Sequence, residues 1–287
     1  MTQAYVAPAV DLASRILALL SRHRMADATL TMISTELGAP KASCLRVLRT
    51  LQAHDLLRYD PETRRYALGS FAVVLGSRAE EHIGYLSALR PLLREAARRT
   101  GCTAVLVQQA GPDRMMYIAK HEDPSRPHVT VSVGNRFPIT DTSYGKWLLA
   151  YSPSDVRDRL LARGLRRVTP NTLVDAAKYR AQLSQIRADG VLVSREEYVR
   201  GVTAVSCPVF DADDEFLGVL AVLAAIPASD TESMRPIAAV MRHLAPACRL
   251  RRIRRRPAFE GTPSRMYLSP GSALTSPAPR ALGQPAS

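Results

Sequence analysis

One predicted helix, over about residues 41–54, carries side chains that could read DNA. Arg46 and Arg49 lie opposite its apolar stripe, at about 100° per residue, and Lys41 and Ser43 flank them. Arginine can bond two acceptors on guanine, whereas lysine and serine can hold phosphates. We predict that these four residues face DNA; the alternative is an ordinary solvated helix face. The apolar stripe is formed by Cys44, Val47, Leu48 and Leu51.

Other reactive side chains do not form a recognisable catalytic or metal site. Gly145-Lys146 lacks the spacing of a phosphate-binding loop, and Trp147 stands at the hydroxyl position. His121-Glu122 and His128 do not match H-E-x-x-H, and prolines between them prevent one helix from presenting both histidines. The sequence contains neither G-x-S-x-G nor G-x-G-x-x-G, and its four cysteines form no C-x-x-C pair. We therefore predict no enzyme activity, no cofactor and no metal.

The positive charge is concentrated near the end of the chain. The net charge is +13, and residues 249–287 hold eight basic residues and one acidic residue. The basic run over 249–256 could bind DNA phosphates nonspecifically or form the solvated end of the last helix. Because the excess lies in a tail, it is weaker evidence for a nucleic-acid partner than a basic fold would be.

The basic helix lies within a pattern typical of a winged helix-turn-helix. A helix over about 10–20 places Val10, Ala13, Leu17 and Leu20 on one face, and Thr29 can cap a second helix. Gly38 ends that second helix in a left-handed turn, and Pro40 opens the basic helix. The runs 56–60 and 65–68 predict a hairpin, the wing, in which Arg64 and Arg65 could touch the DNA backbone or minor groove.

The rest of the chain predicts an α+β fold with a mixed sheet. Strands are expected over 102–107, 115–119, 129–133, 191–194, 203–210 and 217–224, with helices over 86–100, 143–150, 155–163, 175–188 and 232–250. The expected domains are a winged helix-turn-helix over 8–70, a linker helix over 71–85, a regulatory domain over 86–252, and a basic, then Pro/Ser/Ala-rich disordered tail over 253–287.

The composition also limits the location of the protein. No apolar run approaches the ~18 residues needed to span a bilayer, and the N-terminus lacks the pattern of a secretory signal. We expect a cytoplasmic protein without a membrane partner.

Three blocks of sequence resemble the IclR family of bacterial transcriptional regulators. They are LTMISTELGAPKASCLRVLRTLQAHDLLRYDPETRRYALG, VGNRFPITDTSYGKWLLAYSP and SREEYVRGVTAVSCPVFDADDEFLGVLAV, which appear in the order typical of that family. The resemblance implies a C-terminal effector-binding domain similar to GAF/PAS-type sensors. It also implies a helix start beside a cavity, where free backbone N–H groups favour an anion. The implied effector-binding residues are Tyr144, Gly145, Lys146, Glu197, Cys207, Pro208, Ala221 and Leu223.

Strand alternation gives a further expectation for the cavity. Val205, Cys207 and Val209 on one strand, and Val219, Ala221 and Leu223 on the next, are candidates for its apolar wall, although alternation leaves open which face points inward. Tyr144 and Trp147 would narrow the space or stack on a ring. Such walls suit a small, partly apolar organic anion.

The expected partners are double-stranded operator DNA, a small organic anion and further copies of the chain, as a homodimer or homotetramer. One recognition helix buries little surface, so a dimer on a pseudo-palindrome is expected. Two alternatives remain: a metabolite-binding protein or enzyme whose winged helix makes protein contacts, and a basic architectural protein that binds DNA through its tail.

Overall fold

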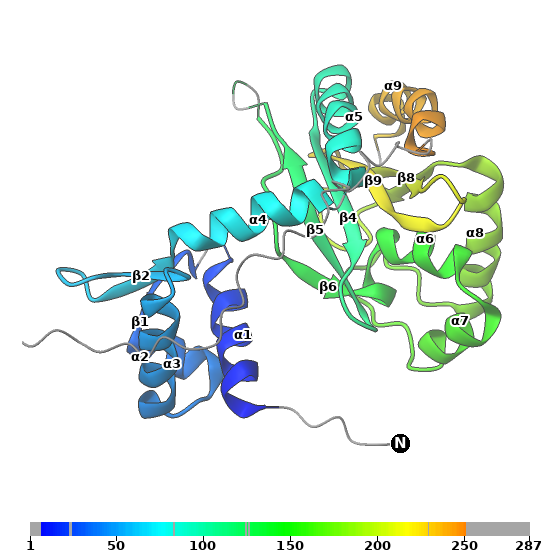
Figure 1. Cartoon of the computed structure of the whole chain (residues 1–287). Helices are drawn as coiled ribbons and strands as arrows, with labels where there is room; N and C mark the ends of the chain where they lie inside the picture. The colour runs from blue at the N-terminus through cyan, green and yellow to red at the C-terminus, as the bar shows by residue number, and fades with distance from the viewer. Residues whose placement is uncertain are drawn as a thin grey trace, which may run out of the picture. The chain divides into compact units, whose positions relative to one another are not determined.

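The computed structural model describes residues 7–22, 25–82, 84–123, 125, 127–228 and 230–250. The N-terminal part contains α1 (Pro8–Leu20), β1 (Asp27–Thr29), α2 (Leu30–Leu37), α3 (Lys41–Ala53) and the hairpin of β2 (Leu57–Asp60) and β3 (Arg65–Leu68) (Figure 1). The three short strands form an antiparallel sheet in the order β1-β3-β2. This arrangement is a winged helix-turn-helix.

Local signals in the sequence explain the helix ends in this part. The Thr29 side chain accepts a hydrogen bond from the Met32 N–H, which caps α2. Gly38 ends α2 with φ at 59°, a left-handed conformation that favours glycine. The predicted stripe of α1 was wrong at Val10, whose side chain is 65% exposed, because Ile16, Leu19 and Leu20 form the buried face. Strand β1 was not predicted from the sequence.

Two helices follow the wing. They are α4 (Ser70–His82) and α5 (Gly84–Thr100), on either side of residue 83. Gly69 is required before α4, because a Cβ atom there would lie 2.2 Å from the Asp55 carbonyl oxygen. The expected domain limits remain predictions, and the expected disordered tail over 253–287 lies outside the described residues.

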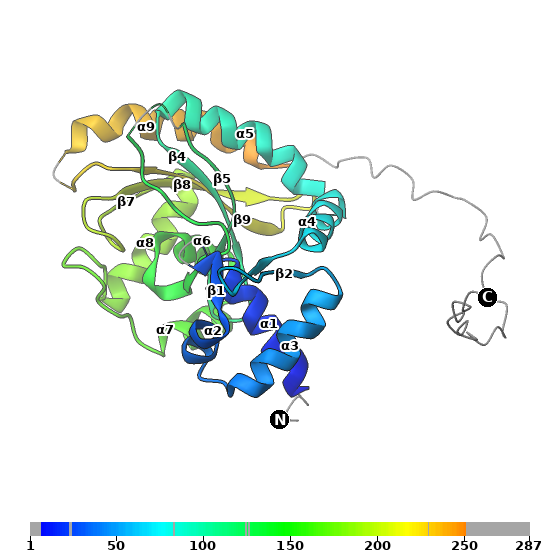
Figure 2. The same ribbon diagram turned by 90° about the vertical axis from the view of Figure 1, so that its left-hand side faces the viewer.

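The C-terminal part is a helix–sheet–helix sandwich (Figure 2). Its strands are β4 (Thr103–Gln109), β5 (Arg114–His121), β6 (Arg136–Pro138), β7 (Leu192–Arg195), β8 (Thr203–Phe210) and β9 (Phe216–Ala224). Helix α5 and α9 (Thr231–Leu244) cover one face of the sheet, and α6 (Ser143–Tyr151) and α8 (Ala176–Asp189) cover the other. The remaining elements are α7 (Ser154–Leu161) and the short 3-10 helices η2 (Ile139–Asp141) and η3 (Ala245–Cys248).

The α+β fold is confirmed, but the expectation of a mixed sheet was wrong. The strand order is β6-β5-β4-β9-β8-β7, and every pairing between these strands is antiparallel. The reason is the connectivity: each half of the sheet is a meander of sequential strands, and the halves meet where β4 pairs with β9.

Two expected elements also differ from the structure. The run 129–133 is not a strand, because side chains bind its carbonyl groups: Thr103 Oγ1 donates to Val129 O at 2.6 Å and Lys120 Nζ to Val131 O at 2.8 Å. The last helix ends at Leu244 rather than near residue 250, and η3 begins directly before Pro246, which cannot donate a backbone hydrogen bond.

Candidate functional site

The outer face of α3 carries the basic residues that the sequence analysis singled out. Arg46 and Arg49 are exposed, as is Lys41 in the first turn, and Ser43 is half-buried. Arg46 Nη2 donates to Ser43 Oγ at 3.3 Å, so these two side chains lie together. On the opposite face Cys44 and Leu48 are fully buried. The structure therefore presents one polar face of α3 to solvent, and its contacts with DNA remain a prediction.

The two arginines of the wing differ in their surroundings. Arg64 is exposed near the hairpin tip with φ at 55°. Arg65 is half-buried on β3, and its Nη1 lies 3.0 Å from Asp27 Oδ1 on β1. The tip is shaped by Asp60, whose carboxylate accepts from the Thr63 hydroxyl at 2.6 Å; this bond lowers the pKa of Asp60. Arg64 is thus the better placed of the two arginines for a DNA contact.

A cavity opens at the α6 face of the C-terminal sheet. In the C-terminal part its lining combines aromatic rings, hydroxyl groups, the basic residue Arg136 and the acidic residue Glu197. From the C-terminal part these are Tyr117, Phe137, Tyr144, Tyr198, Thr142, Ser143, Ser194 and Glu197, with aliphatic side chains that include Val129, Val131, Val202, Ala204 and Leu223. Such a mixture is typical of a site for a small organic molecule.

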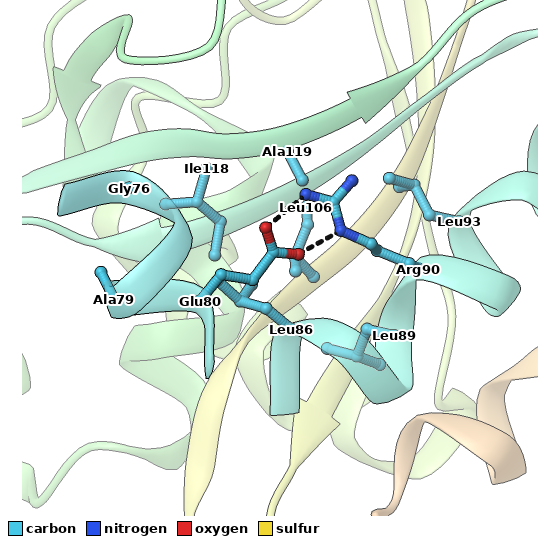
Figure 3. A pocket seen from close by; sticks show the side chains of 10 residues that line it. All are labelled: Gly76, Ala79, Glu80, Leu86, Leu89, Arg90, Leu93, Leu106, Ile118 and Ala119. Carbon is cyan, nitrogen blue, oxygen red and sulfur yellow. Dashed lines mark hydrogen bonds and ion pairs between the residues drawn. The ribbon is translucent and has the colours of Figure 1, made fainter. Parts of the chain in front are cut away.

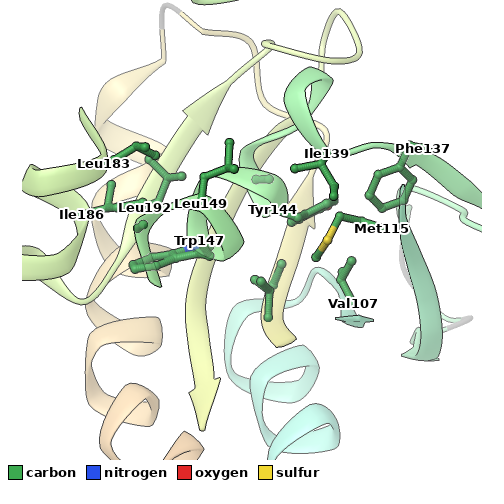
Figure 4. Packing of buried hydrophobic residues seen from close by; sticks show 14 of the residues in the cluster. Val107, Met115, Phe137, Ile139, Tyr144, Trp147, Leu149, Leu183, Ile186 and Leu192 are labelled. Atoms are coloured by element: carbon green, nitrogen blue, oxygen red, sulfur yellow. The ribbon is translucent and has the colours of Figure 1, made fainter. Parts of the chain in front are cut away.

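Aromatic side chains form one wall of this cavity. The ring of Phe137 lies 5.0 Å from that of Tyr117, 5.5 Å from that of Tyr144 and 6.1 Å from that of Tyr198, between centroids. Figure 4 shows Phe137 and Tyr144 beside Met115 and Ile139. The hydroxyl groups of Tyr117 and Tyr144 are 3.4 Å apart, and burial raises the pKa of Tyr117 to about 12. Both phenols are therefore neutral near pH 7.

The start of α6 forms another part of the wall. Gly145 is required there, because a Cβ atom would lie 1.7 Å from the Ile139 carbonyl oxygen in the preceding turn. Thr142, the N-cap residue, has a buried Oγ1 with no hydrogen-bond partner among the described residues. The first-turn N–H groups of a helix have no partner within that helix, and they favour an anion. The cavity thus meets a helix end that can accept negative charge.

Lys146 lies behind this wall in a buried ion pair. Its side chain is 2% exposed and its Nζ lies 2.5 Å from Glu197 Oε2, while Glu197 is 12% exposed. Nζ also donates to Gln182 Oε1 at 2.7 Å and lies 5.4 Å from the centre of the Tyr179 ring. Burial lowers the pKa of Lys146, and Glu197 opposes that shift. Because Glu197 matches its charge, Lys146 does not offer a free cation to the cavity.

The implied effector-binding residues do not all meet at one place. Tyr144, Glu197 and Leu223 line the cavity, whereas Gly145 and Lys146 support its wall. Ala221 and Pro208 lie on the α6 face: Ala221 packs in the α6-side core, and Pro208 pairs with Val219 of that core.

The placement of Cys207 at the cavity was wrong. Cys207 is fully buried on the α5–α9 face, with Val205 and Val209, and its Sγ lies 3.7 Å from that of Cys248. Residues opposite one another in a sheet share a face, and Cys207 pairs with Leu220, not with Ala221. The even-numbered residues of β8 therefore face α6.

Several cavity residues were not predicted from the sequence. Tyr117 lies on β5, Phe137 lies on β6, and Ser194 and Tyr198 lie on or just after β7, so these residues come from three segments that are distant in sequence. Strand alternation puts Tyr117 of β5 on the same face as Met115, but only the sheet order brings that face beside α6. No local motif could have identified them together.

A second cavity, of about 150 Å³, lies between α4, α5, β4 and β5 (Figure 3). Leu86, Leu89 and Leu106 are among its aliphatic walls. Glu80 of α4 and Arg90 of α5 form two parallel hydrogen bonds over it, and the bond from Arg90 lowers the pKa of Glu80. This ion pair joins the two helices on either side of residue 83.

The histidines near residue 121 do not form a metal site within the described ranges. His128 Nε2 lies 4.0 Å from Glu122 Oε2, which also lies 2.8 Å from Lys120 Nζ. Across the described residues, no three His, Cys, Asp or Glu side chains gather in a way that could hold a metal ion. None of the described helices is long and apolar enough to cross a membrane.

A winged helix followed by a domain with a ligand-sized cavity defines a class of ligand-responsive DNA-binding regulators. Comparison with known proteins agrees. Residues 79–247 match the model described as "Bacterial transcriptional regulator IclR C-terminal", and residues 9–61 match the IclR helix-turn-helix domain. The chain therefore belongs to the IclR family.

Individual relatives support this assignment. The chain is 32% identical over 188 residues to the HTH-type transcriptional regulator BhcR of Paracoccus denitrificans, a match that covers 65% of this chain and 67% of that protein. A solved IclR-type regulator from Alicyclobacillus acidocaldarius is 36% identical, with a TM-score of 0.74, and the match covers 85% of this chain and 98% of that one.

A more distant solved structure shares the fold. It is an IclR homologue from Microbacterium hydrocarbonoxydans in complex with 4-hydroxybenzoate, 18% identical with a TM-score of 0.70, and the match covers 83% of this chain and 96% of that one. The relatives are transcriptional regulators rather than enzymes, so the chain is a DNA-binding transcriptional regulator and the enzyme alternative is not favoured.

Proposed function

We propose that this regulator binds a small organic anion with an aromatic or short aliphatic body, and that the anion changes its affinity for operator DNA. The observation that carries the proposal is the meeting of the aromatic wall with the first turn of α6 in one cavity. A ring can pack against Phe137 and Tyr198, while a carboxylate faces the helix start near Thr142 and Ser143. The 4-hydroxybenzoate in the Microbacterium homologue is a molecule of this kind.

DNA recognition is proposed for the polar face of α3 and for the wing. Arg46 and Arg49 would enter the major groove, with Lys41 and Ser43 on phosphates, while Arg64 reaches the neighbouring backbone. Arg65 contributes less, because Asp27 already holds its guanidinium group. We also propose the domain limits 8–70, 71–85 and 86–252.

The surface of α4 supports a dimer. Four large apolar residues near the start of this helix are exposed in the single chain. They are Phe71, Val73, Val74 and Leu75. A patch of this kind on a soluble protein marks an interaction surface. A second copy that covers it would also provide the second recognition helix for a pseudo-palindromic operator. Association of two such dimers would give the homotetramer.

The effector proposal is tested with purified full-length protein. An operator is first selected from random DNA, and a thermal-shift screen then compares organic acids with their neutral amides. We expect acids with a ring or short aliphatic body to raise the melting temperature and to change operator affinity. A set of hits made of cations or sugars, with acids inert, contradicts the anion proposal while leaving DNA regulation intact.

Two variants on one loop localise the effector. Tyr198 lines the cavity, whereas Arg200 is exposed on the same loop and is absent from the lining. We expect Tyr198→Ala to weaken effector binding by about three- to tenfold, since one ring contact is worth about 0.5–1.5 kcal/mol. Arg200→Ala serves as the control and leaves the binding constant unchanged. Equal effects of both substitutions would place the effector elsewhere.

A further inference from the structure

Two cysteine thiols meet on the side of the sheet that is away from the cavity. Cys207 lies on β8 and Cys248 ends η3, and their Sγ atoms are 3.7 Å apart although the residues are 41 positions apart in sequence. Both side chains are fully buried in the core between the sheet and helices α5 and α9. The proposed DNA and effector sites do not use this pair.

The chain after α9 docks on an open edge of β8. Strand β7 pairs with β8 only from Thr203 to Ser206. Beyond Ser206, β7 therefore leaves this edge of β8 available to the chain after α9. Residue Arg249 forms a parallel bridge with Phe210, and the Leu250 N–H donates to the Phe210 carbonyl group at 3.0 Å. The Arg249 guanidinium group lies 4.4 Å from the centre of the Phe210 ring. Cys248 is therefore held beside Cys207 by backbone and side-chain contacts.

We propose that Cys207 and Cys248 are a disulfide-forming pair, whose oxidation by a peroxide fixes the segment after α9 to β8. A disulfide bond has an S–S length of about 2.05 Å, so the two sulfur atoms must approach by less than 2 Å from their contact in the reduced protein. No other described pair of cysteines forms a contact in the structure.

The chemistry needs one molecule of hydrogen peroxide. The thiolate of one cysteine attacks the peroxide O–O bond; that bond breaks, one water molecule leaves after protonation, and the sulfur becomes a sulfenic acid. The second thiol then attacks this sulfur, its proton and the hydroxyl group leave as a second water molecule, and the S–S bond forms. Sulfur loses two electrons overall, and the peroxide gains them.

Burial sets the rate of this reaction. The contact with Cys248 and burial raise the pKa of the Cys207 thiol, which keeps Cys207 largely in the unreactive thiol form. Oxidation therefore proceeds through local opening of the segment around η3, a helix of only four residues. Contacts that hold this segment, such as the exposed pair of Arg249 with Asp214, slow the reaction.

The experiment uses the full-length protein, treated with millimolar hydrogen peroxide and then with an alkylating reagent. Peptide mapping by mass spectrometry without reductant should find residues 207 and 248 in one cross-linked pair within a single chain. Cys207→Ser and Cys248→Ser should each abolish that cross-link, whereas Cys102→Ser should leave it intact. Because the cross-link is scored in the unsubstituted protein first, a variant that fails to fold does not weaken the test.

Two further measurements sharpen the result. The oxidised protein should melt on the order of 10 °C higher than the reduced protein, because the new bond closes a long loop. Arg249→Ala should speed oxidation roughly two- to fivefold, as expected for loss of an exposed ion pair and a cation–π contact. Arg242→Ala on the exposed face of α9 is the control and should not change the rate.

Three outcomes would overturn the proposal. The first is that both thiols remain alkylatable after Cys102 has been fully oxidised. The second is that peroxide produces only cross-links between chains. The third is that Cys207 and Cys248 accumulate as separate sulfinic acids, which would show that the two sulfur atoms do not meet in solution.

Discussion

Removing the charge of Glu197 should destabilise the protein by up to about 5 kcal/mol at pH 7. In Glu197→Gln the ammonium group of Lys146 is buried beside two amide side chains without a counter-charge. Such a group is expected to lose its proton. At pH 7 a lysine is about 3.4 pH units below its ordinary pKa, and each unit corresponds to about 1.4 kcal/mol. Neutralising it therefore costs close to 5 kcal/mol, which is the upper limit for the loss of folding free energy.

The pH dependence of this loss is the sharper test. If Lys146 is neutral in the folded variant and charged in the unfolded chain, the unfolded state binds one more proton. Stability of Glu197→Gln should then rise by about 1.4 kcal/mol per pH unit between pH 7 and 10. In the unsubstituted protein Glu197 opposes the lowering of the Lys146 pKa by burial, so the rise should begin at a higher pH than in the variant.

The reciprocal variant should show the opposite slope. Lys146→Met leaves the carboxyl group of Glu197 largely buried, and protonating it at pH 7 costs up to about 4 kcal/mol. The folded variant then binds the extra proton, so its stability falls as pH rises above the ordinary pKa of glutamate. The double variant, Lys146→Met with Glu197→Gln, should recover most of the loss, since neither charge remains.

Urea denaturation followed by fluorescence measures these effects. The chain has a single tryptophan, Trp147, which is fully buried next to Lys146. The exposed pair of Arg180 and Asp158, at 3.2 Å, is the control, and Arg180→Met should cost less than about 1 kcal/mol. Losses below about 1 kcal/mol in both buried-pair variants, with pH slopes parallel to that of the unsubstituted protein, would show that Lys146 and Glu197 do not depend on each other for their charge.

Three further predictions concern the helix start, the DNA-binding face and the aromatic wall. Gly145→Ala should prevent the native packing of α6, because the added Cβ meets the Ile139 carbonyl oxygen; loss of soluble protein or of the cooperative melting transition checks this. Arg46→Ala should weaken operator binding by about 1–3 kcal/mol in a fluorescence-anisotropy titration, while the melting temperature stays unchanged. Stability should fall above pH 10, because the unfolded phenol of Tyr117 ionises there while its folded pKa is about 12; Tyr117→Phe should reduce that fall.

The winged helix was the most predictable part of the molecule, because its signals are local. Thr29, Gly38 and Pro40 lie at the helix boundaries that their side chains and backbone preferences favour. The basic and apolar faces of α3 also follow directly from residue spacing. In contrast, β1 has three residues and pairs with β3, 38 positions away, so it has no periodicity of its own to detect.

The cavity was less predictable, because its walls depend on sheet order and on the facing of each strand. Strand β8 is buried along its whole length, so an apolar run on it gives no indication of which residues face α6. The facing of β8 is seen only in the structure, where the Ser206 hydroxyl accepts a hydrogen bond from Trp147 Nε1 at 2.9 Å. This contact places the even-numbered residues of β8 toward α6 and Cys207 on the opposite face of the sheet.

In the structure the two residues of the Gly145-Lys146 pair support the cavity wall rather than line the cavity. The family resemblance implied that both residues bind the effector, yet each has a different structural role. Glycine lets α6 approach the preceding turn, and lysine ties α6 to Glu197. Thr172 holds the same segment from the other side, donating to the Glu197 carbonyl group at 2.7 Å. The helix start and the Glu197 segment are therefore fixed relative to each other before any ligand arrives. In the proposed effector site, selectivity among organic anions would then depend on the aromatic side chains that share this cavity rather than on the motif.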